Sequence, residues 1–254
     1  MRFVTGLLFS LGRFSARVSL LSNYVAASTL SLADVKEGIR GSWDGFYARD
    51  EDIASGLMDW EQDLVTRFIR PGAAVLLIGA GSGRDLIPLA EKQCRVTGVE
   101  PASSALDAAR RALRERQLEA TLIEGFFEDV RLSGSFDAVM FSFFSYSYIP
   151  ESHRRIAALR KAAAHLAPGG HVLISYPPML QPRPILITVA RASGAICRSD
   201  WRLEPGDVVT IRNGGFGGYA HAFRPEEIER EATAAGLRFA YRRDYPDPVA
   251  ALVR

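Results

Sequence analysis

Val75-Leu-Leu-Ile-Gly-Ala-Gly-Ser-Gly-Arg-Asp85 is the stretch of this chain that decides its fold. Four apolar residues run directly into Gly79, Gly81 and Gly83, and a polar, helix-compatible segment follows at once. This order predicts a buried strand, a tight glycine turn and the start of a helix. Glycine lets a ligand approach the backbone at such a turn, beside unpaired N–H groups of the helix. We therefore expect a nucleotide-like ligand at this turn.

Short apolar segments alternate with longer amphipathic ones between residues 56 and 176. Each apolar segment has the length of a buried strand, and the segments between them carry apolar residues at helical spacing. Such alternation is typical of βαβ units, in which right-handed crossovers build a parallel sheet. The expected strands are 75–78, 95–100, 120–123, 136–142 and 171–176, and the expected helices are 56–70, 85–92, 103–116 and 152–166.

The C-terminal third departs from this alternation, because residues 176–201 are rich in proline and aliphatic side chains and have the character of an insertion. A glycine-rich turn at 213–218 predicts a hairpin. Pro225 and Gly236 mark the two ends of a late helix. Two closing strands follow it, separated by a Pro-Asp-Pro turn. The expected strands of this part are 207–212, 219–223, 237–245 and 249–253.

The chain divides into two parts after a linker-like patch that contains three glycines between residues 38 and 45. Residues 1–55 are expected to form an amphipathic helix followed by a lid or cap segment. Residues 56–254 are expected to form one domain, with a substrate-cap insertion over 177–222. A chain of 254 residues is long enough to bury one large core of this kind.

The composition argues against several classes of function. Formal net charge is +2, and the basic residues form no cluster with interleaved aromatics, so we expect no nucleic-acid partner. Cys94 and Cys197 are too few for a disulfide framework or a cysteine-rich zinc site, and they fit a reducing cytoplasm. No histidine–carboxylate spacing indicates a metal. No run of about 20 apolar residues predicts a membrane-spanning helix.

The first 33 residues contain three arginines and no acid before Asp34. At about 100° per residue, Arg2, Arg13 and Arg17 fall on one side of a helix and the large apolar residues largely on the other. A secretory signal is the weakest interpretation, because arginines interrupt the apolar region and no clean cleavage site follows. We favour packing, as a lid over the active site or at a dimer interface. Peripheral contact with an anionic membrane surface is the main alternative.

Glu100 stands 17 residues after Gly83, at the end of the second expected strand. In a doubly wound sheet this strand end lies beside the first one, and an acid there can accept both hydroxyls of a ribose. A solvated loop acid is the plainer interpretation, but the preceding apolar strand favours the ribose. NAD, FAD and S-adenosylmethionine all contain such a ribose, so Glu100 alone does not identify the ligand.

Further motifs follow the glycine turn in order: Val-Thr-Gly-Val-Glu-Pro (96–101), Glu-Gly-Phe-Phe-Glu-Asp-Val (124–130), Ser-Phe-Asp-Ala-Val-Met-Phe (135–141), Leu-Ala-Pro-Gly-Gly-His-Val-Leu-Ile (166–174), Phe223-Arg-Pro-Glu-Glu-Ile and Ala235-Gly-Leu. With these motifs, the sequence resembles the class I S-adenosylmethionine-dependent methyltransferases over roughly residues 60–254. A dinucleotide-dependent oxidoreductase would not be expected to carry the Pro168-Gly-Gly turn and the closing antiparallel strands.

This resemblance implies an α/β fold: a doubly wound, seven-stranded, mostly parallel, Rossmann-like sheet with an antiparallel C-terminal strand, plus the N-terminal helical segment. It implies an enzyme that takes its methyl group from S-adenosyl-L-methionine. The expected acceptor is a small apolar or aromatic molecule, methylated on oxygen, nitrogen or sulfur. The alternatives are a non-catalytic, cofactor-binding regulatory or scaffold protein of the same fold, and an oxidoreductase with an adenosine-containing ligand.

The resemblance also implies which residues contact the cofactor. The glycine turn would line its methionine and ribose side, and Glu100 would accept the ribose hydroxyls. Pro101 would lie against the adenine, and the fourth strand would end where the methionine meets the substrate. The cofactor-binding residues assigned in this way are Gly79, Ala80, Gly81, Gly83, Glu100, Pro101, Phe126, Phe127, Phe141 and Ser142.

Two positions depart from the pattern of the family. Phe126 replaces a frequent aspartate, so the hydrogen bond from the adenine amino group moves to the backbone or to Glu128. Leu77 stands where an acid usually helps to hold the α-amino group of the cofactor. Backbone carbonyls at Gly79 or Phe141 can suffice for that group, or cofactor binding is weak or altered.

Five aromatic residues lie between Phe141 and Tyr148, where acceptors dock in this family. Half of them are expected to line a pocket for an apolar or aromatic acceptor, and the rest to pack in the core. Aromatic faces also suit a cationic sulfonium or amine. The expected catalytic residues are Tyr146, Tyr219 and His221, with His221 as a general base near neutral pH. A structurally bonded histidine is an equal alternative.

The Arg84-Asp85 pair after the glycine turn is similar to the sequence of the thiopurine and tellurite methyltransferases, a branch of the family whose acceptors are sulfur or related atoms. A thiolate acceptor needs little base catalysis. This pair of residues therefore favours methylation of sulfur, in a site that needs no strong base.

Overall fold

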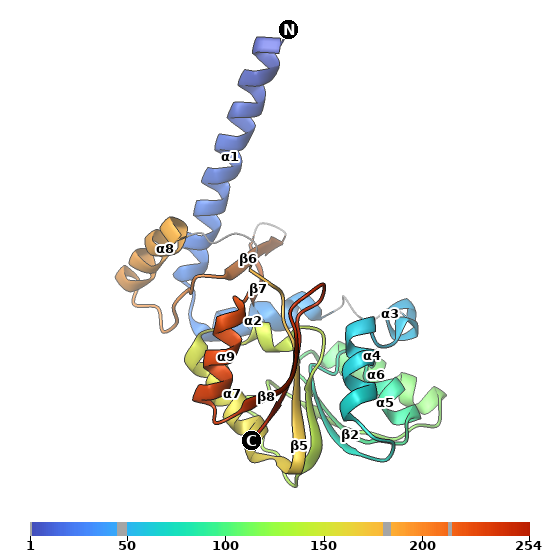
Figure 1. Cartoon of the computed structure of the whole chain (residues 1–254). Coiled ribbons are helices and arrows are strands. Elements are labelled where there is room, and N and C mark those ends of the chain that lie inside the picture. The colour runs from blue at the N-terminus through green and yellow to red at the C-terminus, as the bar shows by residue number, and fades with distance from the viewer. Residues whose placement is uncertain (1, 45–49, 180–183, 213–214) are drawn as a thin grey trace.

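The computed structural model describes residues 2–44, 50–179, 184–212 and 215–254 (Figure 1). Its centre is a seven-stranded sheet in the order β3-β2-β1-β4-β5-β9-β8. Strands β1 to β5 pair in parallel, and β9 runs antiparallel to both of its neighbours, which confirms the predicted fold class. The strands are β1 (Ala74–Ile78), β2 (Arg95–Glu100), β3 (Thr121–Glu124), β4 (Phe136–Phe141), β5 (Leu166–Ser175), β8 (Arg238–Arg243) and β9 (Val249–Val253).

Helices cover both faces of this sheet (Figure 1). Successive residues of a strand point to opposite faces, so Leu76 and Ile78 belong to one buried cluster, and Val75 and Leu77 to the other. Continuous apolar strands are typical of a parallel sheet that is buried on both sides. The first face is covered by α7 (Ser152–Ala164) and α9 (Pro225–Ala234), the second by α4 (Asp59–Phe68), α5 (Leu86–Glu91) and α6 (Ser103–Glu115).

The strand order reverses direction at β1, which lies between β2 and β4. In an open α/β sheet, such a reversal leaves a crevice at the carboxyl ends of the strands. The glycine turn, residues 79–83, lies at this edge. The backbone N–H groups of Gly79 and Ala80 both donate to the carbonyl of Val99, at 2.9 and 3.1 Å, which holds the turn against β2.

A smaller layer lies over this edge of the sheet (Figure 1). Its core contains Tyr24, Ile39, Ile187 and Trp201, all of them buried. The Tyr24 hydroxyl donates to the backbone oxygen of Asp207 at 2.8 Å, which ties the first helix to the hairpin. The layer consists of α1 (Arg2–Ser28), α2 (Leu32–Trp43), α8 (Pro184–Ile196), β6 (Asp207–Arg212) and β7 (Gly215–His221); the short α3 (Asp50–Ser55) and η1 (Ser145–Tyr148) complete the described elements.

The linker predicted around Gly38 and Gly41 is instead part of α2, and Gly45 lies outside the described residues. A capping box that starts at Ser31 begins this helix and offsets the low helix propensity of the two glycines. A Cβ at Gly38 would overlap the ring of Phe216. This glycine therefore permits close packing of α2 on β7 rather than flexibility.

Several predicted boundaries also differ from the structure. The insertion contains a regular helix, α8, despite its prolines. The fifth strand begins at Leu166 instead of His171, because Leu166 pairs with Phe136 across an irregularity in the ladder. Neither Ser103 nor Ser104 caps α6, since Ala102 occupies the cap position. The second hairpin strand runs from Gly215 to His221, earlier than predicted.

The amino-terminal part of α1 extends away from the body of the protein (Figure 1). Near its other end, Tyr24 and Ala27 are buried, and α8 packs beside the helix. The described part of the apolar stripe that was expected to pack is exposed within this chain, and its residues are Leu11, Phe14, Val18 and Leu21. Among the described residues, no helix has the length and apolar character needed to cross a bilayer.

Arg155 on α7 and Glu231 on α9 form a buried ion pair, with 2.8 Å between Nη2 of Arg155 and Oε1 of Glu231. Arg155→Leu should lower the free energy of unfolding by about 3–5 kcal/mol, because it leaves the Glu231 carboxylate buried without its cation. Urea denaturation measures the change. Arg154→Leu is the control, since the partly exposed pair of Arg154 with Glu151 is worth less than about 1 kcal/mol. Equal losses in both variants would contradict this account of the pair.

Candidate functional site

A cavity of about 940 Å³, counting its open mouth, lies at the carboxyl ends of β1, β2 and β4. A cavity of this size holds a ligand as large as a nucleoside derivative. Most of the residues expected to bind the cofactor line it: Gly79, Ala80, Gly81, Glu100, Pro101, Phe126, Phe127 and Ser142.

Gly83 and Phe141 are the two expected residues that do not line the cavity. A Cβ at Gly83 would lie 3.6 Å from Ala109, so this glycine serves the packing of the turn against α6. Phe141 is buried in the core, where its ring packs edge-on against Phe127 and Tyr146. Both residues therefore pack beneath the residues that line the cavity.

The glycine turn forms the floor of the cavity. Gly79 and Gly81 have φ angles of +77° and +52°, in the left-handed region that glycine adopts readily. A Cβ at Gly79 would lie 2.9 Å from the Cβ of Ser145, while a Cβ at Gly81 would meet no atom within 4 Å. Gly81 therefore leaves open space beside its backbone, where a ligand can approach.

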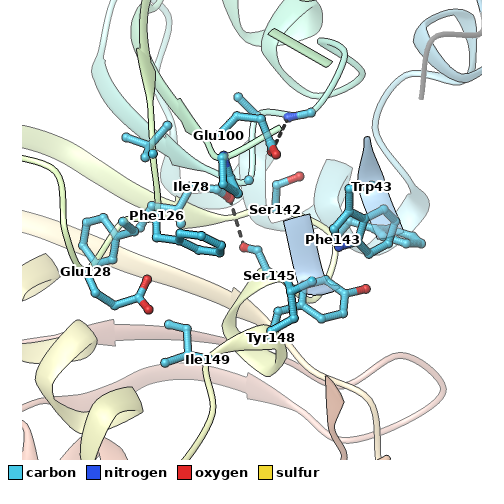
Figure 2. A pocket seen from close by; sticks show the side chains of 18 of the residues that line it. Trp43, Ile78, Glu100, Phe126, Glu128, Ser142, Phe143, Ser145, Tyr148 and Ile149 are labelled. Atoms are coloured by element: carbon cyan, nitrogen blue, oxygen red, sulfur yellow. Dashed lines mark hydrogen bonds between the residues drawn. The ribbon is translucent and has the colours of Figure 1, made fainter. Parts of the chain in front are cut away.

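Glu100 ends β2 at the edge of the cavity, with its carboxylate held by the backbone (Figure 2). Its Oε2 accepts from the N–H of Gly81 at 3.0 Å, and its Oε1 accepts from the N–H of Ala102 at 2.9 Å. Burial raises the pKa of Glu100, and the two backbone bonds oppose that rise. Each carboxylate oxygen keeps a lone pair for a ligand hydroxyl, so a vicinal diol fits this group.

Phe126 and Glu128 form one wall of the cavity (Figure 2). The ammonium of Lys36, from α2, lies 4.8 Å from the ring centroid of Phe126 and 3.3 Å from Oε1 of Glu128. Phe126 thus offers a flat apolar surface, and Glu128 is the nearby acceptor that sequence analysis proposed for an adenine amino group.

The opposite wall is aromatic and contains Trp43, Phe143 and Tyr148 (Figure 2). The rings of Trp43 and Tyr148 pack edge-to-face with centroids 5.1 Å apart. Trp43 and its neighbours on α2 were not among the residues predicted to form the site. The spacing of Val35, Ile39 and Trp43, four residues apart, was the available signal of a helix with one face toward the site.

Phe143 reaches the cavity because the backbone after β4 is strained. Phe143 and Phe144 both have positive φ, at +35° and +61°, a conformation that costs free energy for residues with a side chain. Two hydrogen bonds hold it in place. The N–H of Phe143 donates to Oε1 of Glu61 at 3.0 Å, and the N–H of Phe144 donates to Oγ of Ser175 at 3.1 Å.

Glu61 also anchors a buried charge cluster behind the glycine turn. Its two oxygens accept from both terminal nitrogens of Arg84, at 2.6 and 2.8 Å, and Arg84 donates onward to Oδ2 of Asp85 at 3.1 Å. Ser142, at the end of β4, donates to the same Asp85 oxygen. Sequence analysis did not anticipate Glu61, because an acid on the helix before β1 carries no motif.

The residues predicted to be catalytic are buried outside the lining of the cavity. The Tyr146 hydroxyl donates to Oε2 of Glu231 at 2.6 Å. Burial raises the pKa of Tyr146 well above its usual value, and the Glu231 carboxylate adds to this rise. Tyr146 belongs to the core of the domain with Phe141 and Phe223, whose rings it contacts.

Tyr219 and His221 share the carboxylate of Asp207. Oδ1 of Asp207 accepts from the Tyr219 hydroxyl at 2.7 Å and lies 2.6 Å from Nδ1 of His221. Burial alone would lower the pKa of His221, but the carboxylates of Asp207 and Glu227 raise it above its usual value. This geometry favours a structural role for both residues, and their catalytic role stays a prediction.

Three potential metal ligands, from Glu204, Asp207 and His221, lie within 4.8 Å of one another in the described part of the chain. Oδ2 of Asp207 accepts from the N–H of Glu204 at 2.6 Å. Oε2 of Glu204 accepts from Arg155 at 2.9 Å. Oxygens engaged by a guanidinium and backbone donors are typical of a buried ion-pair network, because a cation next to Arg155 would be repelled.

Known proteins resemble this chain in sequence and fold. A family model described as a methyltransferase domain matches residues 75–170, from β1 into β5. The dTDP-3-amino-3,4,6-trideoxy-alpha-D-glucopyranose N,N-dimethyltransferase of Streptomyces venezuelae is 29% identical over 217 residues, which cover 78% of this chain and 90% of that enzyme.

Two further matches differ in extent. The cypemycin N-terminal methyltransferase of a Streptomyces species is 33% identical over 123 residues; the match covers 42% of this chain and 49%, about half, of that enzyme. The crystal structure of an S-adenosylmethionine-dependent methyltransferase from Methanosarcina mazei superimposes with a TM-score of 0.58, at 19% identity, over 78% of this chain and 96% of that one. This structural match shows the shared fold.

Proposed function

Because this chain belongs to the class I S-adenosylmethionine-dependent methyltransferases, we propose that it transfers the methyl group of S-adenosyl-L-methionine to the nitrogen of a small amine. The single observation that carries the cofactor assignment is Glu100, which presents a carboxylate beside the open space at Gly81. Both hydroxyls of a ribose can donate to such a carboxylate.

The cofactor would extend across the edge of the sheet in the order β3, β2, β1 and β4. Its adenine would lie between Pro101 and Phe126, near the end of β3, and its ribose on Glu100. Its methionine part would pass over Gly79 and Gly81 toward Ser142 at the end of β4. Glu128 offers an acceptor beside Phe126, in place of the aspartate that relatives often carry there.

When bound, the cofactor supplies an electrophilic methyl carbon on a positively charged sulfur. The nitrogen lone pair forms the new bond to that carbon, the carbon–sulfur bond breaks, and its electron pair stays on sulfur. The protein has to hold both atoms in line and exclude water, which the aromatic wall of Trp43, Phe143 and Tyr148 supports. Aromatic rings also suit the cationic sulfur and the cationic amine product.

An amine acceptor agrees with the polar groups around the cavity. Lys36 pairs with Glu128, Arg84 pairs with Glu61, and among the described residues no histidine lines the cavity. A neutral amine already carries its lone pair, so the transfer itself requires no base, and the ammonium product can release its proton to water. Both curated relatives described above are named for methylation of nitrogen.

The sulfur acceptor expected from Arg84-Asp85 receives less support from the same geometry. Both side chains are engaged in the buried cluster with Glu61, behind the glycine turn. The ion pairs of Arg84 and Asp85 are therefore a sufficient reason for these two residues, and they give no information about the acceptor atom.

The nature of the acceptor is tested by incubating the full chain with labelled S-adenosylmethionine and matched acceptors. We expect at least about tenfold faster transfer to amines, represented by a nucleotide-linked amino sugar and a short peptide with a free amino terminus, than to a phenol or a thiol. Preferred transfer to the thiol would restore the sulfur hypothesis. Cofactor binding without transfer to any of these acceptors would favour the non-catalytic alternative.

Glu100→Ala should weaken the binding of S-adenosylhomocysteine by about 10- to 100-fold, because two ribose hydroxyls lose their acceptor in a water-poor site. Isothermal titration calorimetry measures the affinity. Glu124→Ala is the matched control, since Glu124 ends the neighbouring strand β3, is exposed and does not line the cavity. Unchanged affinity in Glu100→Ala would remove the ribose assignment.

A second proposal concerns the exposed apolar stripe of α1, for which we propose contact with an anionic membrane surface. Phe14 is 68% exposed, and Leu11 and Val18 lie beside it on the same helical face. Residues 1–33 contain no acid, and Arg13 and Arg17 flank the stripe. Two copies of α1 would bring like charges together, whereas an anionic lipid surface attracts them.

Sedimentation with vesicles tests this contact. The full chain should sediment with vesicles that contain phosphatidylglycerol and much less with pure phosphatidylcholine, and added salt should weaken the association. Replacement of Phe14 and Val18 by serine should abolish sedimentation, while replacement of the exposed Ser15 and Ser19 by alanine should not. Equal sedimentation of all variants contradicts the proposal. A dimer that only the Phe14/Val18 variant loses would assign the stripe to a second copy.

A further inference from the structure

The charge cluster behind the glycine turn carries more negative than positive charge. Glu61 and Asp85 are both 1% exposed at their side chains, and Arg84, the guanidinium between them, is 11% exposed. Two ionised carboxylates with one guanidinium leave a net charge of −1 in a buried place. Burial of such a charge is costly unless another cation compensates it.

Asp85 and Arg84 both line the cavity, and Asp85 is the acid of this cluster that does so. Its Oδ2 accepts from Arg84 and from Ser142. Its Oδ1 lies 2.9 Å from Nη2 of Arg84, outside hydrogen-bonding geometry, and is buried without a hydrogen-bond partner among the described residues. A buried carboxylate oxygen without a donor is costly, and a donor brought by a ligand in the cavity would lower that cost.

Leu77 occupies the position on β1 at which the family usually has an acid for the α-amino group of the cofactor, and it offers no polar group there. Its side chain is fully buried in the apolar cluster beneath α4, α5 and α6, and it does not line the cavity. Asp85, eight residues further along the chain, accepts a hydrogen bond from Ser142 at the end of β4. Its carboxylate therefore lies on the side of β1 opposite Glu100, which ends β2.

On the basis of the proposed function, we infer that Asp85 is the acid that holds the α-ammonium group of S-adenosylmethionine in this chain. The cofactor's ribose on Glu100 and its ammonium on Asp85 would then span the glycine turn from β2 to β4. The incoming ammonium supplies the second cation of the cluster and a donor for Oδ1. Glu61 acts as a positioning residue, since it lies outside the lining of the cavity and holds Arg84, which pairs with the Asp85 carboxylate.

The protonation of Asp85 agrees with this role. Burial, reinforced by the Glu61 carboxylate, raises the pKa of Asp85 to about 8, while Arg84 and Ser142 oppose the rise. In the absence of a bound cation, a proton on Asp85 therefore compensates the charge of the cluster near neutral pH. A bound ammonium would replace it, so binding of the cofactor product should release a proton to the buffer.

The test compares two ligands that differ only in the amino-acid end. S-adenosylhomocysteine carries the α-ammonium and carboxylate, and 5′-methylthioadenosine lacks both. Asp85→Asn should weaken the binding of S-adenosylhomocysteine by at least about tenfold and change the affinity for methylthioadenosine by less than about twofold. Calorimetry on the full chain measures both affinities. Asp107→Asn, which alters an exposed acid on α6, is the matched control and should change neither affinity.

Calorimetry in two buffers of different ionisation enthalpy gives the second readout. The wild-type chain should release a proton on binding S-adenosylhomocysteine near neutral pH, and Asp85→Asn should release none. Equal weakening of both ligands in Asp85→Asn, or unchanged affinity with proton release retained, would overturn the assignment of Asp85. Failure of both ligands to bind the wild-type chain would instead refute the proposed cofactor site itself.

Discussion

The chain leaves β1 toward β2 on one side and comes back to β4 on the other, and the turn at residues 79–83 has to pass between them. Every feature of the cavity depends on this reversal. It places the ends of three strands around one crevice, so that Glu100, Ser142 and the glycine turn share it although they are far apart in the sequence. Gly79 and Gly81 give the turn its left-handed backbone, and the N–H of Gly81 orients the Glu100 carboxylate.

Buried charges in this protein fall into two groups with different roles. Arg155 and Glu231 join α7 to α9 as a buried pair, and the second carboxylate on Arg155, that of Glu204, is 23% exposed and therefore partly solvated. Asp85 and Glu61 share the single guanidinium of Arg84, so with both acids ionised the cluster is short of one positive charge. The first arrangement is complete without a ligand, whereas the second is completed by a cation in the cavity. Such incomplete pairing at a cavity wall is the physical sign of a binding site rather than of a structural ion pair.

Much of the core and of the cavity floor followed from the sequence, because the strands are short apolar runs and the glycine turn is a local signal. Glu100 and Phe126 were correctly predicted to line the cavity, because each stands at or just after the end of a predicted strand. The wall from α2 was missed, since the three glycines of residues 38–45 suggested a linker, whereas Gly38 and Gly41 lie within α2 and Gly38 permits close packing against Phe216. Tyr219 and His221 were placed near the acceptor by their sequence position. The structure shows that Asp207 binds both side chains inside the smaller layer.

A crystal structure of the full chain with S-adenosylhomocysteine tests the central claim most directly. We expect both ribose hydroxyls within hydrogen-bond distance of the Glu100 carboxylate, roughly 2.6–3.2 Å, with the adenine beside Phe126 and the α-amino nitrogen beside Asp85. A complex with the ligand in the cavity but with its ribose away from Glu100 would contradict the account of the site. A ligand bound elsewhere on the protein would contradict the account as a whole.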